Sequence, residues 1–207
     1  MQHVNRRKSK EDICQILVRT GALRFGTFTL TSGKVSPYYI DLRILPSFPE
    51  AFDIVTGIYE ATARIEIGIG KFDRISGLPT AGIPYGAVLA FRMKKPFVYV
   101  RKEAKTHGRE RRVEGLLSPG ERVLIVDDLI TTGKSTLEAI DAVRCEGGLV
   151  DDALVLIDRE EGGSEALEAA GVKLHAFLKV TEIANTLYSM GSIDKRQFEE
   201  IIKQKTR

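Results

Sequence analysis

The feature that most constrains the fold is a run of four apolar residues, Val123 to Val126, that ends directly in two acids, Asp127 and Asp128. A strand whose residues are all apolar must be covered on both faces, as in the parallel sheets of α/β proteins. Ligands of open α/β sheets bind beyond the carboxyl ends of such strands. The segment therefore predicts a buried strand that delivers two carboxylates to the ligand-binding edge of a sheet.

The rest of the chain alternates between strand-like and helix-like patterns. We expect a helix over 9–20, extended segments over 26–30 and 37–42, and a long helix over 49–67 that has Ser47 as its N-cap. The pattern of the residues after 67 predicts strands at 72–76, 97–101, 122–126, 149–157 and 172–180. It predicts helices at 82–93, 134–146, 164–170 and from 181 onward. This alternation predicts one α/β domain over residues 1–207, with a mostly parallel central sheet flanked by helices. Residues 1–45 are expected to form a small hood over the ligand-bearing edge.

The composition is that of an ordinary soluble protein and points to no special class of protein. Hydrophobic residues make up 43% of the 207 residues and charged residues 29%, which is ordinary for a soluble protein. The formal charge of +3 is too small to argue for nucleic-acid binding. No apolar run reaches the ~18 residues that a membrane-spanning helix needs, and no apolar signal core follows the basic N-terminus, so a cytoplasmic location is expected.

Cys14 and Cys145 fit no metal-ligand spacing and are both expected to be free thiols in the core. His175 is expected to be structural.

The turn after the two acids, Thr131-Thr132-Gly133-Lys134-Ser135, predicts a phosphate site at a helix start. It is not a Walker A loop, because that motif needs a glycine five positions before Gly133, where Asp128 stands. Paired carboxylates would repel nucleotide phosphates, but they accept hydrogen bonds from the hydroxyls of a ribose. The residues therefore favour a ribose 5-phosphate ligand. The alternative is an ordinary strand–turn–helix whose acids cap the helix.

The segment 123–136 closely resembles the phosphoribosyl diphosphate signature of the type I phosphoribosyltransferase family. The resemblance covers roughly residues 15–190 and implies the fold of that family. It also implies that the ligand is phosphoribosyl diphosphate. The residues that would contact it in this segment are Asp127, Asp128, Leu129, Ile130, Thr131, Thr132, Gly133, Lys134 and Ser135.

Residues 100–108 follow a predicted strand and resemble the mobile catalytic loop of the orotate-specific members of this family. Their cationic side chains suit a diphosphate leaving group. The resemblance implies that Arg101, Lys102, Lys105 and His107 bind phosphoribosyl diphosphate, and that Lys105, His107 and Arg101 are catalytic. The alternative is a solvated basic loop.

Three further segments resemble the same orotate-specific members. In 28–41, the resemblance places Tyr39 and Ile40 at the base, whereas a plain β-hairpin is the alternative. In 156–163, it assigns Arg159 to the orotate carboxylate, because a planar guanidinium grips a carboxylate with two parallel bonds. An exposed salt-bridge arginine is the alternative there. The resemblance also assigns Thr131 to orotate binding. In 76–84, it assigns Thr80, Ala81 and Gly82 to a diphosphate-binding turn.

The resemblance implies transfer of ribose 5-phosphate from phosphoribosyl diphosphate to orotate, in pyrimidine biosynthesis. It implies Mg²⁺ as the cofactor, held mainly through substrate and water rather than by direct protein ligands. It also implies a homodimer that shares the catalytic loop between subunits, with no nucleic-acid or membrane partner. This sequence departs from its relatives at Thr31 and Ala81, where lysine is frequent, at Lys134, and at 109–112, where glycine is usual. A transferase for another base and a non-catalytic regulator are the competing hypotheses.

Overall fold

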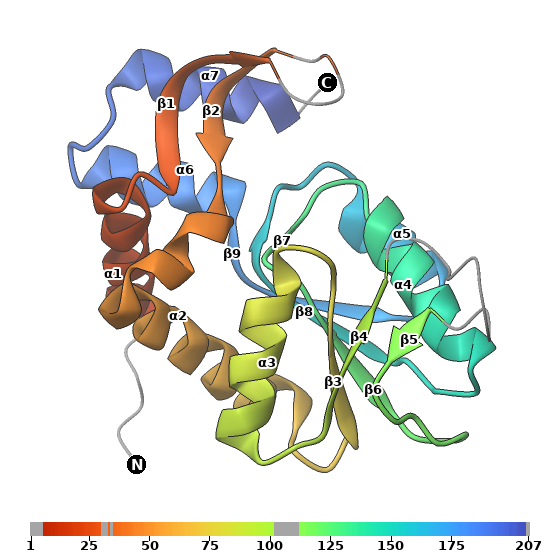
Figure 1. The fold of residues 1–207 in the computed structure, drawn as a ribbon. Coiled ribbons are helices and arrows are strands. Elements are labelled where there is room, and N and C mark those ends of the chain that lie inside the picture. Colours follow the sequence, from red (N-terminus) through yellow and green to blue (C-terminus); the bar gives the residue numbers. More distant parts are fainter. Residues whose placement is uncertain (1–5, 30–32, 34, 102–111, 206–207) are drawn as a thin grey trace. The chain divides into compact units, whose positions relative to one another are not determined.

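The structure is a computed structural model and describes residues 6–29, 33, 35–101 and 112–205. Its internal contacts divide the chain into two compact units (Figure 1). Unit 1 contains residues 1–52 and 178–207, and unit 2 contains residues 53–177. The two ends of the chain thus belong to the same unit. No described helix is both long and apolar enough to span a membrane.

Unit 1 contains a two-stranded antiparallel sheet and four helices. The strands are β1 (Leu23–Thr29) and β2 (Val35–Ile40), and the helices are α1 (Arg6–Arg19), the 3₁₀ helix η1 (Leu42–Ser47), α6 (Val180–Ser189) and α7 (Lys195–Lys205). Helix α1 buries Ile13 and Leu17 and is followed by Gly21 at φ +74°, as its apolar spacing predicts. Helix α6 packs on α1, and α7 packs on α6 and β2.

Unit 2 is built on a seven-stranded sheet with helices between the strands. Its strands are β3 (Arg74–Gly77), β4 (Phe97–Val100), β5 (Val113–Glu114), β6 (Val123–Val126), β7 (Leu129–Ile130), β8 (Asp152–Asp158) and β9 (Lys173–Lys179). The order is β5-β4-β3-β6-β8-β7, and β9 pairs with β8. The pairings of β3 with β4 and β6, and of β8 with β6 and β7, are parallel, whereas β5 runs antiparallel to β4.

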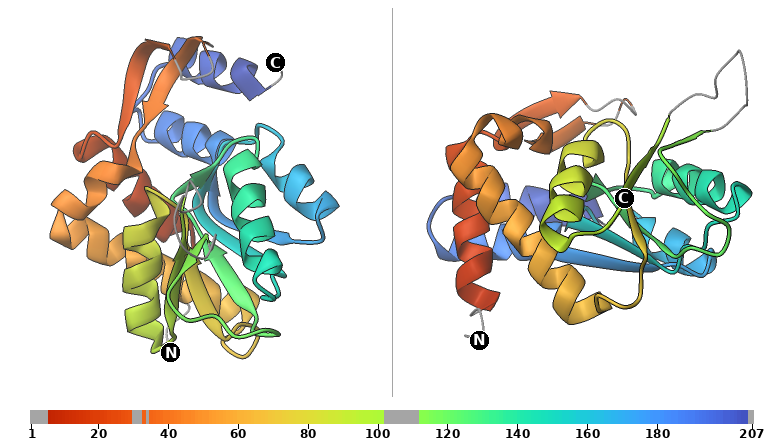
Figure 2. Two further views of the ribbon diagram at one scale, coloured as in Figure 1. Left: turned by 45° about the vertical axis from the view of Figure 1, so that its right-hand side comes forward. Right: turned by 60° about the horizontal axis from the view of Figure 1, so that its bottom comes forward.

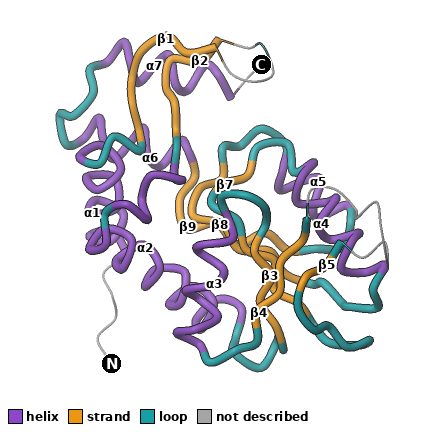
Figure 3. The backbone as a smooth tube through the Cα atoms, viewed as in Figure 1, coloured by secondary structure: helices purple, strands orange, loops and turns teal. Residues whose placement is uncertain are grey.

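Helices cover both faces of this sheet. Helix α3 (Gly82–Met93) lies on one face, and α4 (Lys134–Cys145) and α5 (Gly163–Ala169) lie on the other (Figures 1 and 2). Ile140 and Val143 of α4 and Leu167 of α5 are fully buried, in one cluster with the side chains of β4, β6 and β8. Along the chain from β3 to β9, helix α3 lies between β3 and β4, α4 between β7 and β8, and α5 between β8 and β9, whereas β4 to β7 follow one another without a helix (Figure 3). The predicted fold class, a mostly parallel sheet flanked by helices, is confirmed.

Helix α2 (Pro49–Thr62) connects unit 1 to unit 2 and continues as one wider π-helical segment, η2 (Ala63–Ile67). Its buried stripe includes Val55 and Tyr59. The helix begins at Pro49, as predicted, but the Phe52 N–H donates to the Phe48 carbonyl, so the N-cap is Phe48 and not the predicted Ser47.

The prediction that both thiols lie in the core holds for only one of them. Cys14 is buried, but Cys145 is exposed, so that part of the prediction is wrong. Cys145 is the last residue of α4. At the end of a helix, an apolar position in the helical pattern is not always covered by a neighbouring element. His175 is buried, and its Nε2 lies 2.7 Å from Asp152 Oδ1, which supports a structural role. Whether residues 1–45 cover a ligand stays a prediction.

Candidate active site

The two acids lie in a break between strands β6 and β7. All four residues of β6 are buried, and both β6 and β7 pair with the same strand, β8. The Asp127 N–H donates to the Leu154 carbonyl (3.1 Å), and the Leu156 N–H donates to the Asp128 carbonyl (3.0 Å). The sheet therefore continues alongside the acids and fixes their place at its carboxyl edge, as the sequence predicts.

Each acid is oriented by the backbone that follows it. The Asp128 N–H donates to Asp127 Oδ1 (2.9 Å), and the Leu129 N–H donates to Asp128 Oδ1 (2.8 Å). Burial, and then the neighbouring Asp128 carboxylate, raise the pKa of Asp127 well above its usual value. Two acids held this closely favour a ligand that offers hydroxyl donors or a cation.

The turn after β7 leads into the N-terminus of α4. Gly133 has φ +80°, and a side chain there would lie 3.1 Å from Leu167 Cδ1, so glycine suits both the turn and the packing. The Leu137 N–H donates to the Gly133 carbonyl, which begins the helix. Lys134 and Ser135 are exposed beside N–H groups that have no partner within the helix. This arrangement can bind an anion.

A second turn, from Leu78 to Gly82, meets the acid pair. It joins β3 to α3 and contains a cis peptide bond between Pro79 and Thr80. A Cβ at Gly82 would lie 2.5 Å from the Val126 carbonyl oxygen and 2.8 Å from Asp127 Oδ1. A hydrogen bond from the Gly82 N–H also lowers the pKa of Asp127 against the larger effect of burial. The structure thus brings Gly82 of the predicted diphosphate turn against Asp127.

Arg159 follows β8 at the same edge of the sheet. Its N–H donates to the Ile130 carbonyl (3.0 Å), so it continues the pairing of β8 with β7. The residue is 7% exposed, and its guanidinium Nη2 lies 2.9 Å from Glu161 Oε1. A buried guanidinium on a residue that follows β8, at the edge of the sheet that carries the acid pair, can hold a carboxylate of a ligand.

Arg101 follows β4 at the base of the predicted catalytic loop. Its guanidinium Nη1 lies 3.0 Å from Glu114 Oε1 of β5, and its N–H donates to the Arg112 carbonyl (2.8 Å). The other loop positions predicted to contact the diphosphate, Lys102, Lys105 and His107, lie outside the described residues, so their roles stay predictions.

The predicted base contacts Tyr39 and Ile40 belong to β2 in unit 1. Ile40 is buried, and the Tyr39 ring lies 5.6 Å from that of Phe28, as expected for a hairpin with packed aromatic residues. Tyr39 Oη also accepts a hydrogen bond from Arg43 Nη2 (3.1 Å). Their contact with a base stays a prediction.

Sequence reasoning missed Tyr59, whose hydroxyl donates to the Asp127 carbonyl (2.8 Å) from 68 positions away. Its spacing on α2 indicates a buried side chain but not a polar contact at the site. Sequence reasoning also missed Glu161, although its place two residues after Arg159 was an available signal.

The chain resembles known proteins in family, in sequence and in structure. Residues 50–171 match the family model described as the phosphoribosyl transferase domain. The chain is 46% identical to the orotate phosphoribosyltransferase of Sulfolobus acidocaldarius over 176 residues, which cover 85% of this chain and 87% of that protein.

Among the solved structures that resemble this one are an orotate phosphoribosyltransferase and a UMP synthase. The orotate phosphoribosyltransferase of Aeropyrum pernix is 35% identical with a TM-score of 0.77, over 88% of this chain and 99% of that one. The UMP synthase of Leishmania donovani is 33% identical with a TM-score of 0.85, over 97% of this chain and 43% of that one.

Proposed function

We propose a role for each residue of the site, because this chain belongs to the orotate phosphoribosyltransferases of the phosphoribosyltransferase family. The reaction transfers the ribose 5-phosphate of phosphoribosyl diphosphate to orotate and releases diphosphate and orotidine 5′-monophosphate, in pyrimidine biosynthesis. One observation carries the residue assignment. The Arg159 N–H donates to the Ile130 carbonyl, so the residue for the orotate carboxylate directly adjoins the strand that follows the two acids.

The acid pair and the turn behind it bind the sugar phosphate. Asp127 and Asp128 accept hydrogen bonds from the ribose 2′- and 3′-hydroxyls, each charge-assisted bond being worth about 1.5–3 kcal/mol. The 5′-phosphate lies on the turn and on the free N–H groups of α4. This part of the site is formed by Leu129, Ile130, Thr131, Thr132, Gly133, Lys134 and Ser135.

Orotate is oriented by its carboxylate. Arg159 forms two parallel hydrogen bonds with it, and Thr131 contributes a hydroxyl contact. Tyr39 and Ile40 contact the ring. N1 of orotate forms the bond to C1 of the ribose as the bond from C1 to the diphosphate oxygen breaks, and the N1 proton passes to water or to the departing diphosphate.

The leaving diphosphate is stabilised by cations and backbone N–H groups. As the bond between C1 and the diphosphate oxygen lengthens, positive charge develops on the ribose ring and negative charge on the diphosphate. Arg101, Lys102, Lys105 and His107 balance the negative charge. The turn formed by Thr80, Ala81 and Gly82 holds the diphosphate through its backbone.

Mg²⁺ fits the chemistry of the acid pair. The mutual repulsion that helps to raise the pKa of Asp127 is relieved by a nearby cation. No three His, Cys, Asp or Glu side chains gather into a metal site in the part of the chain that the structure describes. The cation would therefore lie near Asp127 and Asp128 but would be held mainly through substrate oxygens and water, rather than by direct protein ligands. When bound, Mg²⁺ neutralises charge on the diphosphate.

The protein acts as a cytoplasmic homodimer in this proposal, with the catalytic loop of one subunit completing the site of the other. Exposed apolar side chains on α2 and α3, Ile54 and Phe91, support an interface on unit 2. Mixing Lys105→Ala and Arg159→Ala proteins tests the shared loop. Each variant alone is expected to be inactive, and the mixture should regain about a quarter of wild-type activity if each site takes Lys105 and Arg159 from different subunits. No recovery from folded, exchanging dimers would contradict the shared loop.

The activity and the residue roles are tested in one assay. The purified chain is mixed with orotate, phosphoribosyl diphosphate and Mg²⁺, and the loss of orotate absorbance is followed. We expect turnover that chelation of Mg²⁺ abolishes, with no comparable product from adenine, hypoxanthine or uracil. Lys105→Ala is expected to lower turnover by a factor of about 10² or more with folding intact. Near-normal turnover would remove Lys105 from its role.

A further inference from the structure

The peptide group that joins Asp127 to Asp128 is held on both sides. Its N–H, from Asp128, donates to Asp127 Oδ1 (2.9 Å). Its carbonyl oxygen, from Asp127, accepts a hydrogen bond from the Tyr59 hydroxyl (2.8 Å). A rotation of this peptide group would break both bonds. The direction of the Asp127 carboxylate is therefore linked to the contact with Tyr59.

The next peptide group along the chain is held in a different way. The Leu129 N–H donates to Asp128 Oδ1 (2.8 Å), and the Asp128 carbonyl accepts mainly from the Leu156 N–H (3.0 Å) of β8, with a longer contact of 3.4 Å from the Tyr59 hydroxyl. The sheet thus fixes the second acid through its backbone. At the first acid, in the break between β6 and β7, a side chain supplies the corresponding bond. Tyr59 takes the place of a strand partner.

Tyr59 is built into the core as a rigid hydrogen-bond donor. It is 1% exposed, and its ring stacks on that of Tyr85 with 5.4 Å between the centroids. From this buried position the hydroxyl donates its hydrogen bond to the Asp127 carbonyl.

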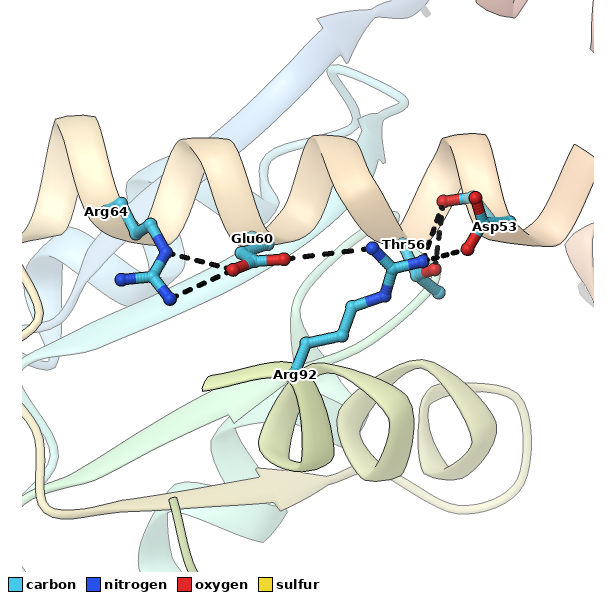
Figure 4. A network of polar contacts seen from close by, with 5 residues as sticks. All are labelled: Asp53, Thr56, Glu60, Arg64 and Arg92. Atoms are coloured by element: carbon cyan, nitrogen blue, oxygen red, sulfur yellow. Dashed lines mark hydrogen bonds and ion pairs between the residues drawn. The ribbon is translucent and has the colours of Figure 1, made fainter. Parts of the chain in front are cut away.

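The helix that carries Tyr59 is tied to α3 by a polar network (Figure 4). Arg92 of α3 forms an ion pair with Asp53 and lies 3.7 Å from Glu60 Oε2, so it connects two turns of α2. Arg64 contacts the other oxygen of Glu60 at 2.9 Å. Because Glu60 follows Tyr59 directly, this network limits the movement of the tyrosine backbone.

We propose that Tyr59 is a positioning residue for substrate binding, acting through the peptide group that orients Asp127. This inference rests on the proposed role of Asp127 in binding the ribose. Tyr59 itself does not touch the substrate. Removal of its hydroxyl should therefore weaken binding of phosphoribosyl diphosphate, because Asp127 would no longer be held in the direction that the ribose hydroxyl requires.

Tyr59→Phe keeps the ring and removes only the hydrogen bond. We expect its dissociation constant for phosphoribosyl diphosphate, measured by calorimetry with Mg²⁺ and without orotate, to rise about tenfold. Incorporation of 4-aminophenylalanine at position 59 restores an N–H donor and should recover most of the affinity. Tyr188→Phe is the matched control, since Tyr188 is also stacked, on Phe198, but lies in α6; it should bind like the wild type.

A double-mutant cycle with Asp127→Asn separates positioning from a structural role. If Tyr59 acts through Asp127, Tyr59→Phe should have less than a twofold effect on affinity in the Asp127→Asn background. An undiminished effect in that background would overturn the inference. If Tyr59→Phe does not fold, 4-methylphenylalanine at position 59 supplies a donor-free ring of nearly the size of tyrosine. Equal affinities for it and for the wild type would also overturn the inference.

The outcome distinguishes this inference from the proposed function. If the wild-type chain itself binds no phosphoribosyl diphosphate, the proposed function fails. If the wild type binds it and Tyr59→Phe binds equally well, the role of Tyr59 alone fails.

Discussion

The guanidinium of Arg159 is paired with Glu161, two residues further along the chain, with 2.9 Å between Nη2 and Oε1. Between them, Glu160 has φ +58° and donates its N–H to Asp158 Oδ1 (2.8 Å), which forms the tight turn that brings Glu161 back. A buried charge requires a compensating partner. Glu161 therefore pairs with the same guanidinium that the proposed function assigns to the carboxylate of orotate.

Arg159→Lys is expected to raise the KM for orotate by a factor of about 10², because an ammonium group cannot form the two parallel bonds of a guanidinium. The dissociation constant for phosphoribosyl diphosphate should change less than threefold, since the acid pair is untouched. Steady-state rates at varied orotate and calorimetry with phosphoribosyl diphosphate measure the two effects. An orotate KM within twofold of the wild-type value would exclude Arg159 from carboxylate binding.

Glu161→Gln is expected to lower the KM for orotate by a factor of about 2–5, because the substrate carboxylate no longer competes with a charged neighbour for Arg159. Glu168→Gln is the control, since Glu168 is an exposed acid of α5. The same orotate titration measures both variants. If the orotate KM rises for Glu161→Gln but not for Glu168→Gln, Glu161 supports Arg159 rather than competing with the substrate.

The parts of the site that the sequence predicts are those that end a buried strand. The apolar runs before Asp127 and Arg159 are long enough to be identified as strands, and parallel strands deliver their carboxyl ends to one edge. Gly133 lies in the turn that the sequence predicts, and it has φ +80°, which glycine adopts without strain. The helices follow from their spacing, and α3 begins and ends at the predicted residues.

Other features depend on contacts that no local pattern contains. The spacing on α2 indicates that Tyr59 is buried, but its partner lies 68 positions away. Strands β5 and β7 contain two residues each, which is too short for a periodic signal. Cys145 fits a helical pattern, yet nothing in the sequence shows that the end of α4 lacks a covering layer.

The two thiols are expected to differ in reactivity. Burial raises the pKa of Cys14 to about 12, whereas Cys145 is exposed. At pH 8 an aromatic disulfide reagent should therefore modify one thiol per folded chain and both thiols in denaturant. Cys145→Ser should abolish the rapid reaction. Two rapidly reacting thiols in the folded protein would show that the environment of Cys14 opens readily.

Gly82→Ala tests the close approach between the diphosphate turn and the acid pair. A methyl group at this position would lie 2.5 Å from the Val126 carbonyl oxygen and 2.8 Å from Asp127 Oδ1. We expect a loss of about 1–3 kcal/mol in the free energy of unfolding and weaker binding of phosphoribosyl diphosphate. The control is Gly70→Ala, where an added Cβ meets no atom within 4 Å. Chemical denaturation and calorimetry measure both variants, and unchanged values for Gly82→Ala would contradict the packing.

Asp127→Asn is expected to abolish turnover and to stabilise the ligand-free fold at neutral pH. Burial and the Asp128 carboxylate raise the pKa of Asp127, so the folded protein holds a proton that the unfolded chain releases near the ordinary value of about 3.9. The folded state therefore binds more protons above that pH, and the free energy of unfolding contributed by Asp127 falls as the pH rises toward the folded pKa. Asparagine removes this dependence, because it does not ionise.

Thermal unfolding from pH 4 to pH 8, without Mg²⁺ or substrate, measures this effect. The melting temperature of Asp127→Asn should exceed that of the wild type increasingly as the pH rises, by about 2–4 °C for each kcal/mol of penalty removed. Asp141→Asn, a change in an exposed acid of α4, controls for the loss of one negative charge. The wild type should regain the difference when Mg²⁺ and phosphoribosyl diphosphate are added, because a ligand that binds only the folded state stabilises it. A variant that melts below the wild type at pH 8 would mean that the Asp127 carboxylate stabilises the fold, and that its function imposes no stability cost.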